Sequence, residues 1–93
     1  MAASLVLAFI GGALAGNAVP HFVRGITKQR YPNVWGGGPM PNVVAGWAGL
    51  VLAAVSLRFA FHGNSEVWPF CAAAVGVLLI GLFHAGPGAF GRR

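Results

Sequence analysis

Residues 2–30 read AASLVLAFIGGALAGNAVPHFVRGITKQR, and the arrangement of the whole chain follows from this stretch. Residues 2–19 contain no charged side chain, and three cations follow at Arg24, Lys28 and Arg30. An apolar run of about 18–20 residues is long enough for a helix to cross the hydrocarbon core of a bilayer. A basic cluster at the end of such a run prefers the cytoplasmic side. The stretch therefore predicts a transmembrane helix whose C-terminal end lies in the cytoplasm.

The composition is that of a membrane protein. Of the 93 residues, 57% are hydrophobic and 8% are charged, whereas soluble domains carry roughly a quarter charged residues. The net charge is +5, from six Lys and Arg against a single acid, Glu66. The cations lie at the ends of apolar runs rather than interleaved with aromatic residues. We therefore expect other membrane subunits and anionic lipids as partners, and no nucleic acid.

Two further apolar runs follow the first span, which covers about residues 2–21. They cover about residues 43–61 and 67–85. The connection 24–42 is basic and rich in Gly and Pro, which predicts a cytoplasmic loop. The connection 62–66 consists mainly of turn-forming residues, so it predicts a short outer turn with the second and third spans as antiparallel neighbours. We expect one all-α membrane domain over residues 1–93, with three transmembrane helices.

The cations are distributed unequally between the two ends of these spans. Three spans place the loop and the C-terminus on one side, which collects Arg24, Lys28, Arg30, Arg92 and Arg93. The other side holds only Arg58, which we expect to pair with Glu66. The positive-inside rule then predicts an N-terminus outside and a C-terminus in the cytoplasm. The five cytoplasmic cations are predicted to contact lipid headgroups.

Small residues recur every four positions in each span. At this spacing they share one helix face and let a neighbouring backbone approach closely. The predicted helix-packing residues are Ala8, Gly12 and Gly16, then Ala45, Gly49 and Ala53, then Ala72 and Gly76. Three thin helices are not expected to bury all these faces against one another. Part of this surface is therefore predicted to contact helices of other proteins.

Few polar side chains fall inside the spans. Asn17 is expected to hydrogen-bond across helices, Pro20 to kink or end the first helix, and Arg58 to extend toward the nearby interface. His21 and His84 would lie near the inner ends of their spans. An imidazole there can ligate a haem iron or a chlorophyll magnesium. The alternative is that each histidine is solvated or hydrogen-bonded.

Residues 16–25, GNAVPHFVRG, resemble a motif of small bacterial inner-membrane proteins with no assigned activity. The pattern is roughly GN, two residues, PHF and then a Gly, followed by a Pro-rich loop and further apolar helices. The resemblance implies a multi-pass protein of the bacterial inner membrane. It implies no activity, cofactor or substrate.

The sequence does not predict an enzyme. It has no Asp and one Glu, so paired-carboxylate catalysis is excluded, and the common serine-nucleophile and zinc spacings are missing. We expect a non-catalytic accessory or scaffold subunit of a larger membrane complex, for example an electron-transfer or photosynthetic one. Two alternatives stay open. One is a subunit that ligates haem or chlorophyll through His21 or His84, and the other is a homo-oligomeric pore or carrier with Arg58 and Asn17 facing inward.

Overall fold

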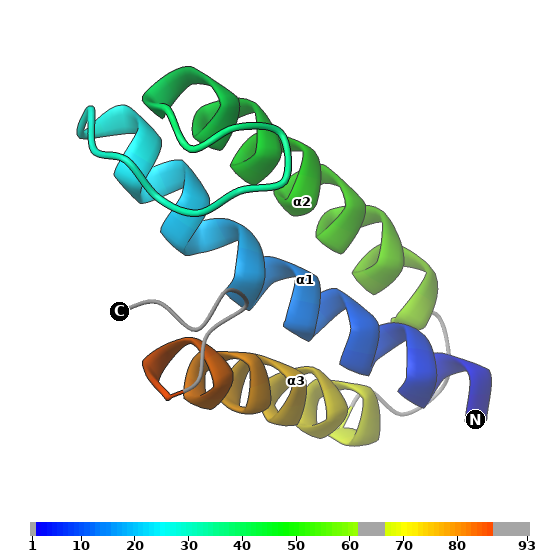
Figure 1. The fold of residues 1–93 in the computed structure, drawn as a ribbon. Helices are drawn as coiled ribbons and strands as arrows, with labels where there is room; N and C mark the ends of the chain where they lie inside the picture. The colour runs from blue at the N-terminus through cyan, green and yellow to red at the C-terminus, as the bar shows by residue number, and fades with distance from the viewer. Residues whose placement is uncertain (1, 62–66, 87–93) are drawn as a thin grey trace.

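The computed structural model describes residues 2–61 and 67–86, which form three α-helices (Figure 1). Helix α1 covers Ala2–Ile26, α2 covers Pro39–Ala60 and α3 covers Val67–Ala85. All three helices are long and apolar enough to cross a membrane. The prediction of an all-helical chain with three helices of transmembrane length is confirmed.

Helix α1 continues through Pro20 and ends at Ile26, beyond the span expected from hydropathy. Proline is tolerated within apolar, tightly packed helices because neighbouring groups compensate for the missing N–H. The helix ends where Lys28 adopts a left-handed backbone with φ of 62°. The N–H of Gln29 then donates to the carbonyl of Arg24 at 2.8 Å. This is a Schellman-type end, which satisfies a terminal carbonyl and redirects the chain.

Helix α2 begins at Pro39, earlier than expected, so residues 39–42 belong to the helix. Pro39 and Pro41 lie in its first turn, where backbone N–H groups have no helical acceptor and the fixed φ of proline suits the helix. The prolines that indicated a loop therefore start the helix instead. The connection between α1 and α2 is residues 27–38.

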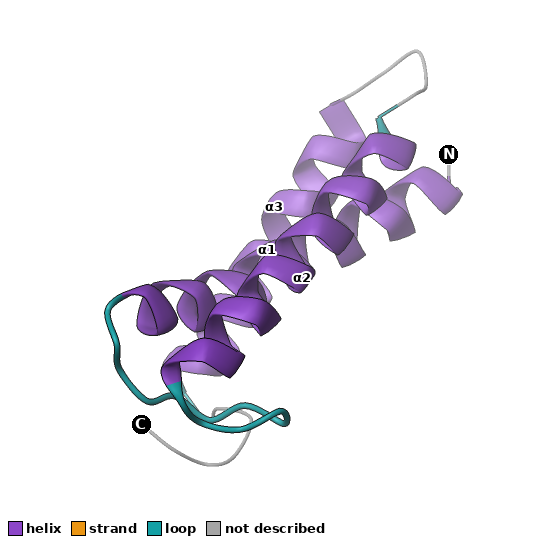
Figure 2. Cartoon of the chain, turned by 90° about the horizontal axis from the view of Figure 1, so that it is seen from above, coloured by secondary structure: helices purple, strands orange, loops and turns teal. Residues whose placement is uncertain are grey.

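Helix α1 lies between α2 and α3 (Figures 1 and 2). It packs along both of them, whereas α2 and α3 make few contacts with each other. The expectation that the second and third spans are packed neighbours is therefore wrong. The physical reason is that α1 carries small residues on two sides: a Cβ at Gly11 would meet Leu57 of α2, and a Cβ at Gly12 would meet the backbone of Ala73 in α3.

The interior of the bundle is made of small residues, and the exterior is apolar. The buried apolar side chains are those of Ala8, Ala18, Ala53 and Ala60. Large apolar side chains point outward on all three helices, among them Val6, Leu52, Phe59, Phe70 and Leu82. Soluble proteins place such side chains inside. This arrangement suits a chain whose outer surface is covered by lipid or by other helices.

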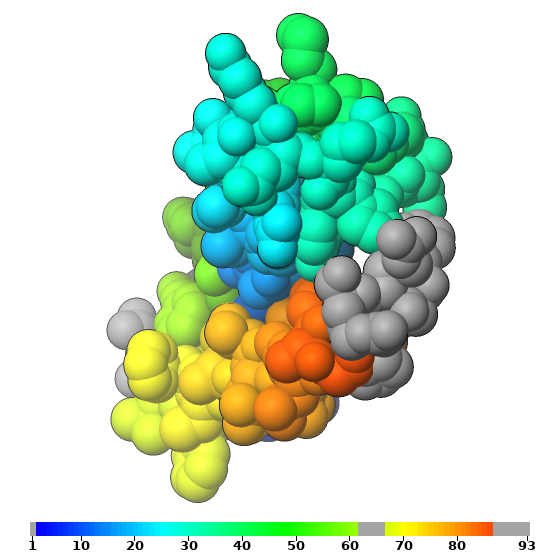
Figure 3. All heavy atoms as spheres, turned by 60° about the vertical axis from the view of Figure 1, so that its left-hand side comes forward, coloured from blue at the N-terminus to red at the C-terminus, as the bar shows by residue number. Residues whose placement is uncertain are grey.

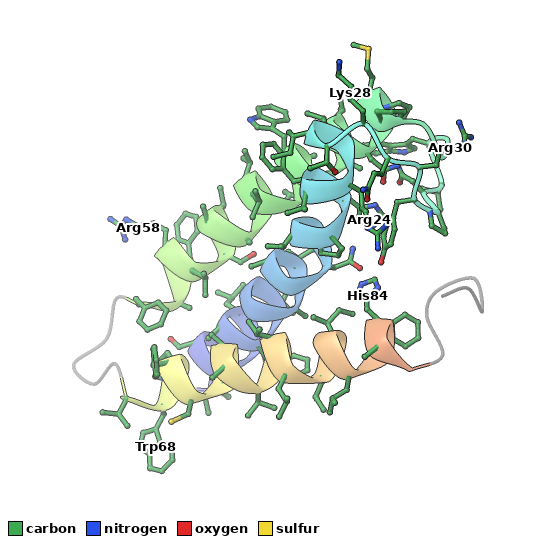
Figure 4. All side chains as sticks on the ribbon, turned by 90° about the vertical axis from the view of Figure 1, so that its left-hand side faces the viewer. Arg24, Lys28, Arg30, Arg58, Trp68 and His84 are labelled. Atoms are coloured by element: carbon green, nitrogen blue, oxygen red, sulfur yellow. The ribbon has the colours of Figure 1, made fainter. Side chains whose placement is uncertain are left out.

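The charged residues gather at two separate ends of the bundle (Figure 4). Arg24, Lys28 and Arg30 lie at the same end as His84, and Arg58 lies at the opposite end with Trp68. The predicted outer turn 62–66, the pairing of Arg58 with Glu66, and Arg92 and Arg93 fall outside the described residues.

Candidate functional site

Five polar side chains meet where the 27–38 loop covers the end of the bundle. We call them the polar cluster: Asn17, His21, Tyr31, Asn42 and His84. They come from α1, the loop, α2 and α3, so the cluster joins every element of the described chain. In the space-filling view, the loop lies against the end of α1 and close to the last turn of α3 (Figure 3). This is the main polar contact region among the residues that the structure describes.

Asn42 is the centre of the cluster and is fully buried, with 0% of its surface exposed. Its Nδ2 donates to the carbonyl oxygens of Tyr31 and Gly38, each at 2.9 Å, and lies 3.3 Å from that of Gly37. A side-chain amide has two N–H donors, so the third contact is shared. Its Oδ1 lies 2.6 Å from Nδ1 of His21. Asn42 therefore ties the loop backbone to the start of α2 and to α1.

The contacts of Asn42 decide which ring nitrogen of a neutral His21 donates. Because Nδ2 of Asn42 faces carbonyl oxygens, its Oδ1 must be the atom that faces His21. Nδ1 of His21 is then the donor, and Nε2 carries the lone pair in the neutral ring. The ring also meets Tyr31 edge-on, with centroids 5.1 Å apart and planes at 79°.

His84 completes the cluster from α3. Its Nε2 lies 2.7 Å from Oδ1 of Asn17, and its Nδ1 lies 3.3 Å from the hydroxyl of Tyr31. In a neutral imidazole these contacts are satisfied if Nε2–H donates to Asn17 and Nδ1 accepts from Tyr31. Both ring nitrogens are therefore engaged inside the protein.

Local sequence explains how these groups come together. Asn17 and His21 are four residues apart in α1, so they share one helix face, and Arg24 lies one turn further along it. The loop is held in shape by its own backbone: Tyr31 N–H donates to Gly37 at 3.0 Å, and Gly36 N–H donates to Asn33 at 3.0 Å. Gly36 has φ of 117°, a conformation that favours glycine.

The predicted headgroup cations have different surroundings. The guanidinium carbon of Arg24 lies 5.3 Å from the centroid of the Tyr31 ring. Its Nη1 donates to Oε1 of Gln29 at 3.1 Å. Lys28 and Arg30 are exposed beside it. Arg58 is exposed at the end of the bundle opposite to His84 (Figure 4), whereas Asn17 bonds to His84, so the structure does not bring Arg58 near Asn17.

Most of the predicted packing residues lie between the helices of this chain. A Cβ added at Gly12 or Gly16 would meet α3, one at Gly49 would meet α1 at Ala18, and one at Gly76 would meet α1 at Phe9. Ala8 and Ala53 are buried, and Ala45 and Ala72 are half-buried. Each of these four glycines therefore faces another helix of this chain. Among the helical glycines with a described environment, Gly81 alone has no atom within 4 Å of an added Cβ.

The sequence analysis named neither Asn42 nor Tyr31 as a site residue. The signal for Asn42 was an amide next to Pro41 at the start of an apolar run, the position where side chains often bind loop backbone. His21 and His84 were candidate cofactor ligands, and in the structure they hydrogen-bond to Asn42, Tyr31 and Asn17. Among the described residues, no group of three or more His, Cys, Asp or Glu side chains could hold a metal ion.

Comparisons of this chain with protein-family models, with curated proteins and with solved structures found no match.

Proposed function

We propose that this chain is a non-catalytic accessory subunit of a larger complex in the bacterial inner membrane. In this proposal its three helices span the membrane, with the N-terminus outside and the 27–38 loop in the cytoplasm. The support for this orientation is the distribution of charge, since Arg24, Lys28 and Arg30 share one end and Arg58 lies at the other (Figure 4).

The observation that carries the accessory role is the setting of Gly81. A glycine inside a helix costs about 1 kcal/mol relative to alanine, so it needs a compensating reason. For each of the other helical glycines, an added Cβ would come closer than 3.0 Å to an atom of a neighbouring helix. Gly81 has no such neighbour within the described chain, and α3 packs substantially on α1 alone. A helix of another subunit, packed closely on α3 at Gly81, supplies the missing reason.

The polar groups support the same conclusion. The five side chains of the polar cluster bond to one another and to the loop backbone, and they offer no set of groups arranged for catalysis. The haem or chlorophyll alternative is weaker at His84, because both of its ring nitrogens have partners, and it depends on Nε2 of His21, since Nδ1 of that ring bonds to Asn42. The pore alternative is weaker because Arg58 and Asn17 lie in different parts of the bundle (Figure 4).

Purification of the tagged chain in mild detergent, followed by native mass spectrometry, tests the proposal. We expect companion membrane subunits at fixed stoichiometry. The variant Gly81→Leu should lose them, whereas Ala54→Leu, a matched change at an exposed small residue of α2, should retain them. A wild-type chain without companions would contradict the proposal. A Soret or chlorophyll band would favour the cofactor alternative, and a conducting homo-oligomer would favour the pore.

A further inference from the structure

We propose that the guanidinium of Arg24, stacked on Tyr31, binds the phosphate of an anionic phospholipid at the loop end of the bundle. Lys28 and Arg30 add positive charge around this site. The inference depends on the proposed membrane orientation, because it needs the loop to lie at the headgroup layer. The proposal goes beyond the nonspecific attraction between a basic loop and an anionic membrane, because it names one binding site for one headgroup.

Arg24 is held in place while most of its donors stay available. Its guanidinium lies over the Tyr31 ring at 5.3 Å, and one nitrogen donates to Gln29 at 3.1 Å. A guanidinium has five N–H donors in a planar fork that matches two oxygens of a phosphate. The contacts of Arg24 with Gln29 and Tyr31 use one N–H donor and one face of the guanidinium, and the side chain is exposed. The remaining donors can therefore reach a ligand from outside.

The ring under Arg24 is itself fixed from several directions. Tyr31 packs edge-on against His21, and its hydroxyl meets His84. Its carbonyl accepts from Asn42, and its N–H donates to Gly37. A cation resting on a fixed ring loses less conformational freedom when it binds than one on a mobile loop. The polar cluster thus acts on the site through Tyr31, which is a positioning residue.

The loop end carries three cations and, among the described residues, no acidic side chain. The only acidic side chain of the sequence, Glu66, falls outside the described residues. Three cations at the loop end are therefore left without a carboxylate among the described residues.

Neighbouring apolar residues make a lipid the occupant we commit to. Val23 and Ile26, on the last turns of α1, are 46% and 57% exposed, and Trp35 in the loop is 60% exposed. An arginine within a turn of exposed apolar residues at the end of a membrane helix, with an exposed tryptophan in the loop that follows, suits the depth of phospholipid phosphates. A soluble anion would not need this apolar border.

The test uses the full chain in detergent, titrated with phosphatidylglycerol or with phosphatidylcholine of the same acyl chains. Native mass spectrometry measures the apparent affinity for each lipid. We expect the wild type to prefer phosphatidylglycerol and Arg24→Gln to lower that affinity about fivefold, which corresponds to ~1 kcal/mol, the usual contribution of one cation near an anionic surface. Arg58→Gln is the matched control, since it removes an equal charge at the other end, and should leave the preference unchanged.

A second variant, Arg24→Lys, keeps the charge but loses the planar fork, and we expect an affinity between those of the wild type and Arg24→Gln. Equal affinities for the two lipids in the wild type would overturn the proposal. Equal losses in Arg24→Gln and Arg58→Gln would also overturn it, because only net charge would then matter. Companion subunits in the same spectra report separately on the accessory role, so either idea can fail alone.

Discussion

Asn42→Ala should release the 27–38 loop from the bundle. The substitution removes the donors to three loop carbonyls and the acceptor for His21. The carbonyls of Gly37 and Gly38 keep other donors, namely the N–H groups of Tyr31 and of residue 42 itself. The substitution therefore removes two hydrogen bonds that nothing replaces, one to the carbonyl of Tyr31 and one to the ring of His21, and both are partly buried. At about 1 kcal/mol each, the loop should be destabilised by about 2 kcal/mol.

Limited trypsin digestion in detergent measures this change directly. Cleavage after Lys28 and Arg30 requires the loop to open, so its rate follows the population of the open form. A destabilisation of about 2 kcal/mol corresponds to a roughly thirtyfold faster cleavage. Asn33→Ala is the matched control, because Asn33 makes a single side-chain bond, to the carbonyl of Pro41 at 3.2 Å. It should accelerate cleavage by no more than about fivefold.

Asn42→Asp distinguishes the contribution of the amide oxygen, which faces His21, from that of the amide nitrogen, which faces the loop carbonyls. It keeps an oxygen for His21 but places a carboxylate against the loop carbonyls, so it should behave like Asn42→Ala. Equal cleavage rates for Asn42→Ala and Asn33→Ala would refute the reasoning that Asn42 holds the loop. A wild-type rate for Asn42→Asp would show that the three carbonyl contacts contribute nothing.

Three further changes test the packing and the helix ends, each through the free energy of unfolding in detergent. Gly12→Ala would press a Cβ onto the backbone of α3 and should lower the free energy of unfolding by about 1–3 kcal/mol. Gly81→Ala meets no neighbouring atom and should raise it by up to about 1 kcal/mol. Equal effects of the two substitutions would contradict the packing described. Lys28→Gly removes a left-handed lysine and should stabilise the protein by about 1 kcal/mol, and an equal gain from Lys28→Ala would argue against that cause. Asn17→Leu removes the acceptor for His84 and should cost about 1 kcal/mol; an unchanged imidazole nitrogen chemical shift would show that this bond is not made.

The number and type of the helices could be predicted from the sequence because each helix is a continuous apolar run. Length and hydropathy are local properties, and they suffice to identify a span. The positions of the helix ends could not be predicted as well from the sequence. Pro20 is compatible with a helix interior here and Pro39 with a helix start, and sequence pattern alone does not distinguish these uses of proline.

The packing order could not be predicted because small residues occur on several faces of each helix. The sequence spacing marks Gly12 and Gly76 as sites of close approach, but it does not say which helices meet there. The structure places α1 between the other two, since its Gly and Ala residues face both ways. The short connection 62–66 suggested a different pairing, because adjacency in sequence was taken for adjacency in space.

The polar cluster was predicted only in part. Asn17 was expected to bond across helices, and it does bond to His84 in α3. Asn42 was missed because its importance depends on a loop that folds back over it, a contact between distant parts of the chain. The role of Tyr31 was missed for the same reason, since its partners lie on α1, α2 and α3.

Labelling of single cysteines tests the central claim, a three-helix membrane protein with its basic loop in the cytoplasm. The native Cys71, the only cysteine, is first changed to Ala, and one cysteine is then introduced at Gln29 in the loop or at Phe61 beyond α2. An impermeant maleimide is applied to intact spheroplasts and to inverted membrane vesicles. We predict that Phe61→Cys is labelled in spheroplasts and Gln29→Cys only in inverted vesicles. Labelling of Gln29→Cys in intact spheroplasts, with Phe61→Cys protected, would contradict the account.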